Sequence, residues 1–116
     1  MILFICSEGK YRSKTAADIF NDKGIPSEYI GIFSRYLKHR DLNRFIKFAD
    51  IVFCMENYLK IKLLKYLNSI GKTFPPKCYV LDIEDKYMYN DDVLIKILLD
   101  KIIPILEKHG MKINEQ

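Results

Sequence analysis

The sequence predicts an α/β fold in three layers, α/β/α, with a four-stranded parallel open sheet in the middle. Apolar runs of strand length alternate with segments of helical periodicity, in the order β-α-β-α-β-α-β-α. Three of the four apolar runs are nearly continuous, which is typical of strands that are buried on both faces. No linker, repeat or low-complexity segment interrupts the chain, so we expect one domain over residues 1–116, with a loose tail after about residue 110.

The strand-like runs are short and rich in branched and aromatic residues. They cover residues 2–6 (ILFIC), 29–33 (YIGIF), 51–54 (IVFC) and 78–81 (CYVL). Right-handed crossovers are expected to join them. In open sheets of this kind, ligands bind at the carboxyl ends of the strands, near the point where the strand order reverses. Cys6 ends the first run, so the pattern places a thiol at such an edge.

Four helices are expected between and after these runs. The first has an apolar stripe that ends with Phe20, and Gly24 and Pro26 stop it. A shorter one is expected over residues 42–48, and leucines at positions 59, 63, 64 and 67 mark a third. The fourth runs from about Val93 to Leu106. Pro104 is expected to kink or fray it, and Gly110 to end it.

The composition is that of a globular protein. Apolar residues make up 49% of the chain and charged residues 29%, so a packed core is feasible. No apolar run approaches the length of a membrane span, and the N-terminal MILFIC lacks the basic region and cleavage site of a secretory signal. We therefore expect a cytoplasmic protein with no membrane partner. The net charge of +4 is spread over helical segments, which favours a solvated surface over a nucleic-acid site.

The three cysteines, Cys6, Cys54 and Cys78, are odd in number and widely spaced. No pair has the spacing of a zinc site, so reduced thiols and no metal are expected. Cys54 and Cys78 lie in strand-like runs and are predicted to belong to the core.

The stretch from Cys6 to Ser13 (CSEGKYRS) joins the first strand to the first helix. Free backbone N–H groups at a helix N-terminus favour an anion, and Gly9 permits a backbone angle that other residues resist. A thiol in that field is stabilised as the thiolate, which is the nucleophilic form. Arg12 can supply a planar fork for phosphate oxygens. Ser13 can donate to the thiolate or cap the helix. These parts suit phosphoryl transfer through a cysteinyl phosphate.

In spacing and position, Cys6, Arg12 and Ser13 match the C-x5-R-[ST] loop of low-molecular-weight protein tyrosine phosphatases, and SKTAADIF is similar to the helix that follows it in that family. Residues 48–63 (FADIVFCMENYLKIKL) resemble the family's central strand and helix, and residues 82–91 (DIEDKYMYND) resemble its late D-P-Y loop. The three segments occur in the family's order and are distributed over most of the length of a chain that resembles a compact member.

The resemblance implies that Cys6 is the nucleophile, that Arg12 is catalytic, and that Asp85 is the general acid. It also implies a phosphate-binding loop made of Ser7, Glu8, Gly9, Lys10, Tyr11, Arg12 and Ser13, and substrate binding by the loop tyrosine, Tyr87. The implied substrates are phosphotyrosine proteins or small aryl phosphates. The implied enzyme uses no cofactor and acts as a monomer.

Several positions remain open from the residues alone. Asp82, Glu84 and Asp85 all follow the fourth strand-like run, at the same sheet edge as Cys6, and only the register of the D-P-Y loop favours Asp85. Lys10 and Tyr11 either line the mouth of the site or are solvated loop residues. The segment after the second strand is expected to border the cleft through Arg35, Lys38, His39 and Arg40, with no role assigned to His39.

Five positions depart from the family's usual pattern. Lys14 replaces a proline after Ser13, Tyr11 replaces the second cysteine of some members, and Lys86 replaces the proline of the D-P-Y loop. Glu8-Gly9 stands where Gly-Asn is frequent. A carboxylate two residues from the nucleophile opposes an anionic ligand unless it points away from it.

Glu8 therefore leaves a second function open, a catalytically weak or inactive phosphate-binding module on the same fold. A thiol-dependent arsenate reductase needs two further cysteines close together late in the chain, where only Cys78 stands. A cysteine-loop sugar phosphotransferase has no need of Arg12 and leaves the late aspartate unexplained.

Overall fold

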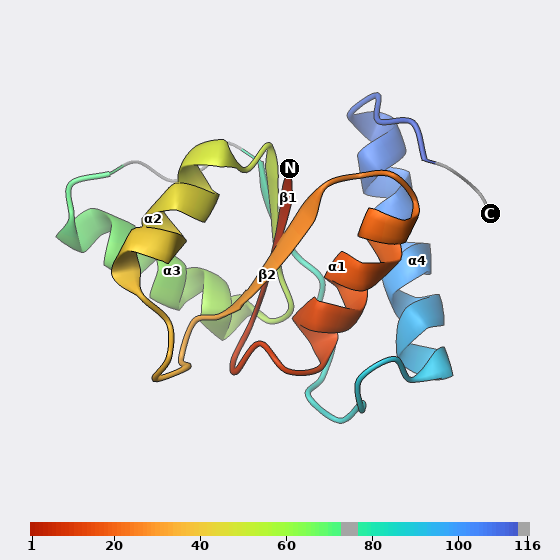
Figure 1. Cartoon of the computed structure of the whole chain (residues 1–116), viewed down its shortest axis with the longest axis horizontal. Helices are drawn as coiled ribbons and strands as arrows, with labels where there is room; N and C mark the ends of the chain where they lie inside the picture. The colour runs from red at the N-terminus through yellow and green to blue at the C-terminus, as the bar shows by residue number, and fades with distance from the viewer. Residues whose placement is uncertain (73–76, 114–116) are drawn as a thin grey trace.

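The computed structural model of the chain has helices on both faces of a parallel sheet (Figure 1). The structure describes residues 1–72 and 77–113. The elements, in order, are β1 (Ile2–Cys6), α1 (Arg12–Asp22), β2 (Ser27–Gly31), α2 (His39–Phe48), β3 (Ile51–Cys54), α3 (Asn57–Ser69), β4 (Cys78–Val80) and α4 (Asp92–Lys108). The predicted fold class and element order are confirmed.

The sheet has the strand order β2-β1-β3-β4, and every neighbouring pair is parallel. The chain leaves β1 toward β2 on one side and reaches β3 on the other, so the strand order reverses at β1. In the register, Cys6 pairs with Gly31, and Ile5 pairs with Cys54. The segments that follow β1, β2 and β3 therefore emerge side by side at the carboxyl edge, where ligands bind in open α/β sheets.

Figure 1 shows α1 and α4 on one flank of the sheet and α2 and α3 on the other. On the face toward α1, aromatic rings form a row, with Phe4 stacked between Phe20 and Phe53 at centroid distances of 5.9 and 5.5 Å. Tyr79 continues the row beside Phe53. All five residues of β1 are buried, so the strand that carries Cys6 is anchored by apolar packing on both faces.

The helices bury the stripes that their periodicity predicts. The fully buried residues of α3 are Leu59, Leu63 and Leu67, at a spacing of four. In α4 the buried residues keep the same spacing, at Leu94, Leu98, Ile102 and Leu106. Both patterns leave the polar residues of the helices toward solvent.

The element boundaries differ from the predictions by a few residues. The structure confirms β1 and β3 as predicted, whereas β2 begins at Ser27 and ends at Gly31 because a turn follows, in which Ser34 donates to the Gly31 carbonyl. α2 begins at His39, three residues before the apolar stripe that predicted it.

The last helix continues through Pro104 to Lys108, so Pro104 does not end it. Gly110, at φ 74°, terminates it, and the Met111 amide donates to the Leu106 carbonyl as in a glycine-terminated helix. The predicted loose tail falls partly on residues 114–116, which lie outside the described residues.

Cys54 is buried in β3, and Cys78 is partly buried in the neighbouring β4, where it packs against the core. A hydrogen bond with Cys78, together with burial, raises the pKa of Cys54. Cys54 is therefore an uncharged core residue, as predicted. Within residues 1–72 and 77–113, no helix is both long enough and apolar enough to cross a membrane.

Candidate active site

The loop between β1 and α1 wraps around the sulfur of Cys6. The backbone N–H of Gly9 donates to Sγ at 3.1 Å, and the Ser13 hydroxyl lies 2.8 Å from Sγ. Gly9 has φ +73°, which turns its amide back toward the sulfur at little cost for a glycine. The loop therefore places a backbone amide and a hydroxyl within hydrogen-bond distance of the sulfur.

The backbone of β2 presses directly against this loop. The Ile32 and Phe33 amides donate to the carbonyls of Cys6 and Ser7 at 3.0 and 2.9 Å. A Cβ atom on Gly31 would lie 2.1 Å from the carbonyl carbon of Glu8, so no larger residue fits there. Gly31 is not among the site residues that the sequence predicts. A glycine inside a strand-like run is a signal of such a close backbone approach.

Arg12 is the largest of the fully buried side chains, with 1% of its surface exposed. Its Nη1 donates to Glu56 Oε1 at 2.5 Å and to the carbonyl of Ile83 at 2.6 Å. Its Nε lies 3.7 Å from Asp85 Oδ1. The guanidinium therefore contacts the segments that follow β3 and β4.

Burial by itself lowers the pKa of Arg12. Hydrogen bonds to Glu56 and Tyr58 and the negative charges of Asp85 and Cys6 outweigh burial and raise that pKa overall. Arg12 thus remains a cation at every physiological pH. Glu56, which neutralises it, went unassigned in the sequence analysis. Glu56 lies two residues after the strand 51–54, at the same sheet edge as Cys6, and this position in the sequence could have indicated a role in the site.

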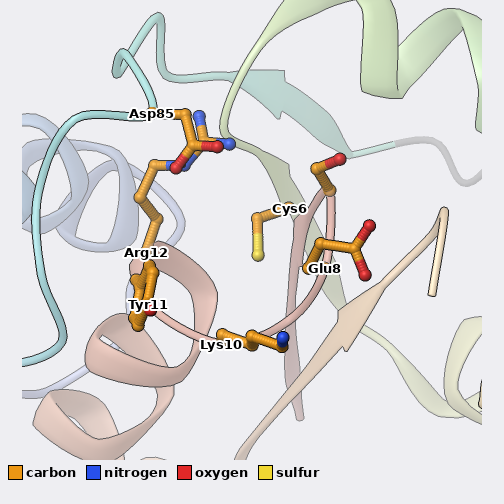
Figure 2. Close-up of a pocket in the computed structure, with 7 residues that line it drawn as sticks. Cys6, Glu8, Lys10, Tyr11, Arg12 and Asp85 are labelled. Carbon is orange, nitrogen blue, oxygen red and sulfur yellow. The ribbon is translucent and has the colours of Figure 1, made fainter.

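The pocket above the loop has a volume of about 210 Å³. It is lined by Cys6, Ser7, Glu8, Lys10, Tyr11, Arg12 and Asp85. In Figure 2, Asp85 lies beside the guanidinium of Arg12, and Lys10 lies on the opposite rim. Lys10 and Tyr11 therefore belong to the mouth of the pocket, one of the two placements that the residues left open.

Glu8 lines the same pocket, but its carboxylate is directed away from Cys6 (Figure 2). It lies at the exposed side of the loop, toward the neighbouring hollows beside β2 and residues 33–36. A charge that faces water is strongly screened. The repulsion that Glu8 exerts on an anion in the pocket is correspondingly weak.

Among the three carboxylates that follow β4, Asp85 lines the Cys6 pocket. Asp82 and Glu84 line a different hollow, together with Tyr87, and Glu84 pairs with Lys86 at 3.8 Å. The structure thus brings Asp85, Cys6 and Arg12 together and leaves the two rival carboxylates outside the pocket.

The remaining predicted residues lie further away. Tyr87 packs against the core and borders the hollow that contains Asp82, so its contact with a substrate ring stays a prediction. Arg35 lines a hollow next to the pocket, and Lys38 lines another. The ring of His39 packs against Tyr66 at 5.2 Å. In the part of the chain that the structure describes, no cluster of three or more metal-ligating side chains occurs.

Comparison with solved structures shows the architecture to which this pocket belongs. YwlE arginine phosphatase from Geobacillus stearothermophilus superposes with a TM-score of 0.66 and 19% identity over 94% of each chain. A low-molecular-weight phosphotyrosine phosphatase from Vibrio cholerae superposes with a TM-score of 0.62 and 14% identity, over 95% of this chain and 98% of the other. The chain has the low-molecular-weight phosphotyrosine phosphatase fold.

A solution structure of a low-molecular-weight protein tyrosine phosphatase from Bacillus subtilis is similar as well, with a TM-score of 0.61 and 18% identity over 95% of this chain and 99% of that one. No protein-family model and no curated protein sequence matches the chain. The fold that the sequence motifs imply is therefore confirmed by three-dimensional similarity.

The close approach between Gly31 and Glu8 predicts that Gly31→Ala is strongly destabilising. The added Cβ meets backbone atoms that cannot rotate away, so we expect a loss of about 3 kcal/mol in the free energy of unfolding. Gly110→Ala is the control, since its Cβ meets nothing within 4 Å and its positive φ alone costs about 1 kcal/mol. Urea denaturation measures both. Equal losses of unfolding free energy in the two variants would contradict the close contact between Gly31 and the Glu8 backbone.

The ion pair of Arg12 predicts the effect of Glu56→Gln. The glutamine keeps an acceptor but removes the charge that faces a buried guanidinium, so the free energy of unfolding should fall by about 1–2 kcal/mol. Glu84→Gln is the matched control, because Glu84 and Lys86 are 76% and 60% exposed. Its loss should stay below about 0.5 kcal/mol. If Glu56→Gln were as stable as this control, Glu56 would not stabilise the buried charge of Arg12.

The direction of Glu8 predicts a small effect of Glu8→Gln on anion binding. Because the carboxylate faces solvent, the affinity for inorganic phosphate should rise less than about threefold at physiological salt. Titration calorimetry measures it. A rise above about tenfold would mean that Glu8 faces the bound anion.

Proposed function

We propose that the protein is a cysteine-dependent phosphatase that hydrolyses phosphotyrosine or small aryl phosphate monoesters through a cysteinyl-phosphate intermediate. The observation that carries the proposal is the convergence of the Cys6 thiol, the Arg12 guanidinium and the Asp85 carboxylate on one pocket. The likeness of the fold to known phosphatases supports it. We expect the enzyme to act as a cytoplasmic monomer without a cofactor.

In the first step, the Cys6 thiolate attacks phosphorus in line with the leaving aryl oxygen. The P–S bond forms as the P–O bond breaks, and Asp85 donates its proton to the departing oxygen. The amides of the loop and the side of Arg12 that faces Asp85 stabilise the negative charge on the equatorial oxygens. The Gly9 amide and the Ser13 hydroxyl lie within hydrogen-bond distance of the attacking sulfur.

In the second step, water attacks the phosphocysteine. The Asp85 carboxylate takes a proton from that water, the new O–P bond forms, and the P–S bond breaks to release inorganic phosphate and the thiolate. Asp85 ends the cycle protonated, ready for the next substrate. A carboxylate that is 59% exposed on the pocket rim is open to the water that this step requires.

Tyr11 supports the choice of an aryl substrate. It lines the pocket with 39% of its surface exposed, so its ring offers a face on which a substrate ring can stack. Phosphoarginine is the second substrate class to test, because one protein with this fold is an arginine phosphatase. A guanidinium can also stack on a tyrosine ring, and its departure needs a proton in the same way.

Hydrolysis of p-nitrophenyl phosphate in the presence of a chelator tests the proposal. The unmodified protein should turn over, whereas Cys6→Ser should lose at least about 10⁴-fold in kcat because it lacks the nucleophile. Cys6→Ser should still bind inorganic phosphate. Phosphate binding without turnover in the unmodified protein would favour the binding-module alternative.

Asp85→Asn should reduce kcat/KM for an aryl phosphate by about 10²–10³-fold, the usual contribution of a general acid. Asp82→Asn is its matched control and should leave kcat/KM nearly unchanged, since Asp82 lies outside the pocket. The reverse ranking would transfer the acid role to Asp82. Parallel assays with phosphotyrosine and phosphoarginine peptides decide the substrate class.

A further inference from the structure

The loop that carries Asp85 is tied at both ends to the segment around Arg12. At its start, Arg12 donates to the Ile83 carbonyl at 2.6 Å, and the Ile83 amide donates to the Met55 carbonyl at 2.9 Å. At its end, the Asn90 amide donates to Thr15 Oγ1 at 2.9 Å. Residues 84–89, which include Asp85, are held between these two ties.

The hydroxyl of Thr15 makes two hydrogen bonds at once. It accepts from the Asn90 amide, and it donates to the carbonyl of Tyr11 at 2.7 Å. Thr15 is fully buried, so no water can replace either partner. Tyr11 precedes Arg12 and lines the pocket. One hydroxyl therefore joins the end of the loop that carries Asp85 to Tyr11, the residue immediately before α1.

Asn90 has φ 62°, a left-handed conformation that costs free energy for any residue with a side chain, although asparagine tolerates it better than most. The bond to Thr15 holds its amide in that conformation. Asp91, the next residue, caps α4 by accepting from the Val93 and Leu94 amides. The ties through Asn90 and Asp91 thus set where the loop meets the last helix.

We propose that Thr15 is a positioning residue that couples the acid-bearing loop to the phosphate loop and so holds Asp85 over the pocket. The inference rests on the proposed function, in which Asp85 is the general acid. A second contact at the same end involves Tyr89, which donates to Asp18 and lies under the Lys14 ammonium at 4.4 Å. This contact is exposed and correspondingly weak. The buried hydroxyl of Thr15 therefore carries the coupling.

A purely structural role for Thr15 is the competing explanation, because threonine hydroxyls in helices often bond the carbonyl four residues back. The two explanations differ in how the loss depends on the leaving group. p-Nitrophenolate departs with little help from an acid, whereas phenolate needs a proton. Loss of positioning should therefore harm phenyl phosphate selectively, and loss of stability should harm both substrates alike.

The experiment compares Thr15→Val, which keeps the shape and removes the hydroxyl, with Thr15→Ser, which restores it. We expect Thr15→Val to lower kcat/KM for phenyl phosphate about tenfold more than for p-nitrophenyl phosphate, and Thr15→Ser to recover most of that difference. Ser27→Ala is the matched control, because its buried hydroxyl donates to the Ile25 carbonyl away from the pocket. An equal loss on both substrates would overturn the proposal.

Amide hydrogen exchange gives a readout that does not depend on activity. In the unmodified protein, the Asn90 amide should exchange at least about tenfold more slowly than an open loop amide. In Thr15→Val that protection should disappear. Fast exchange of Asn90 in the unmodified protein would refute the coupling. A protected Asn90 in a protein that hydrolyses no phosphate monoester would refute the proposed function instead.

Discussion

A single buried guanidinium joins three of the four strand ends at the carboxyl edge of the sheet. Arg12 follows β1 through the loop of residues 7–11, Glu56 follows β3, and Ile83 follows β4. An unpaired charge at that depth would cost several kcal/mol, so the bonds to Glu56 and to the Ile83 carbonyl favour the convergence of all three segments. The same convergence delivers Asp85 to the pocket. Assembly of the site is thereby part of folding.

The backbone of β2 packs against the remaining side of the loop between β1 and α1. Gly31 lets that strand approach the loop closely enough for Ile32 and Phe33 to bond the carbonyls of Cys6 and Ser7. Both carbonyls are thereby hydrogen-bonded to backbone amides of the segment that follows β2. The pocket over this loop is also lined by two cationic side chains, Lys10 and Arg12.

The surroundings of Glu8 and Lys86 at the carboxyl edge of the sheet explain how two of the departures from the family pattern are tolerated. Glu8 is accommodated because its carboxylate faces solvent on the far side of the loop. Lys86 stands in place of a proline, so the loop that contains Asp85 lacks the stiffness that proline would give. The ties through Ile83 and Asn90 restrain that loop from its two ends. Hydrogen bonds from Ile83 and Asn90 to neighbouring elements therefore restrain the loop that contains Asp85, in place of the missing proline.

The sequence by itself determined the alternation of strands and helices, the strand that carries Cys6 and the spacing from Cys6 to Arg12, because these depend on periodicity and on residues close together in the chain. It left three carboxylates after β4 and gave no role to Gly31, Glu56 or Thr15. Those choices depend on which side chains meet across segments up to 75 residues apart, as Thr15 and Asn90 do. Only tertiary packing determines these contacts, since a local sequence pattern does not show which distant residue a side chain will face.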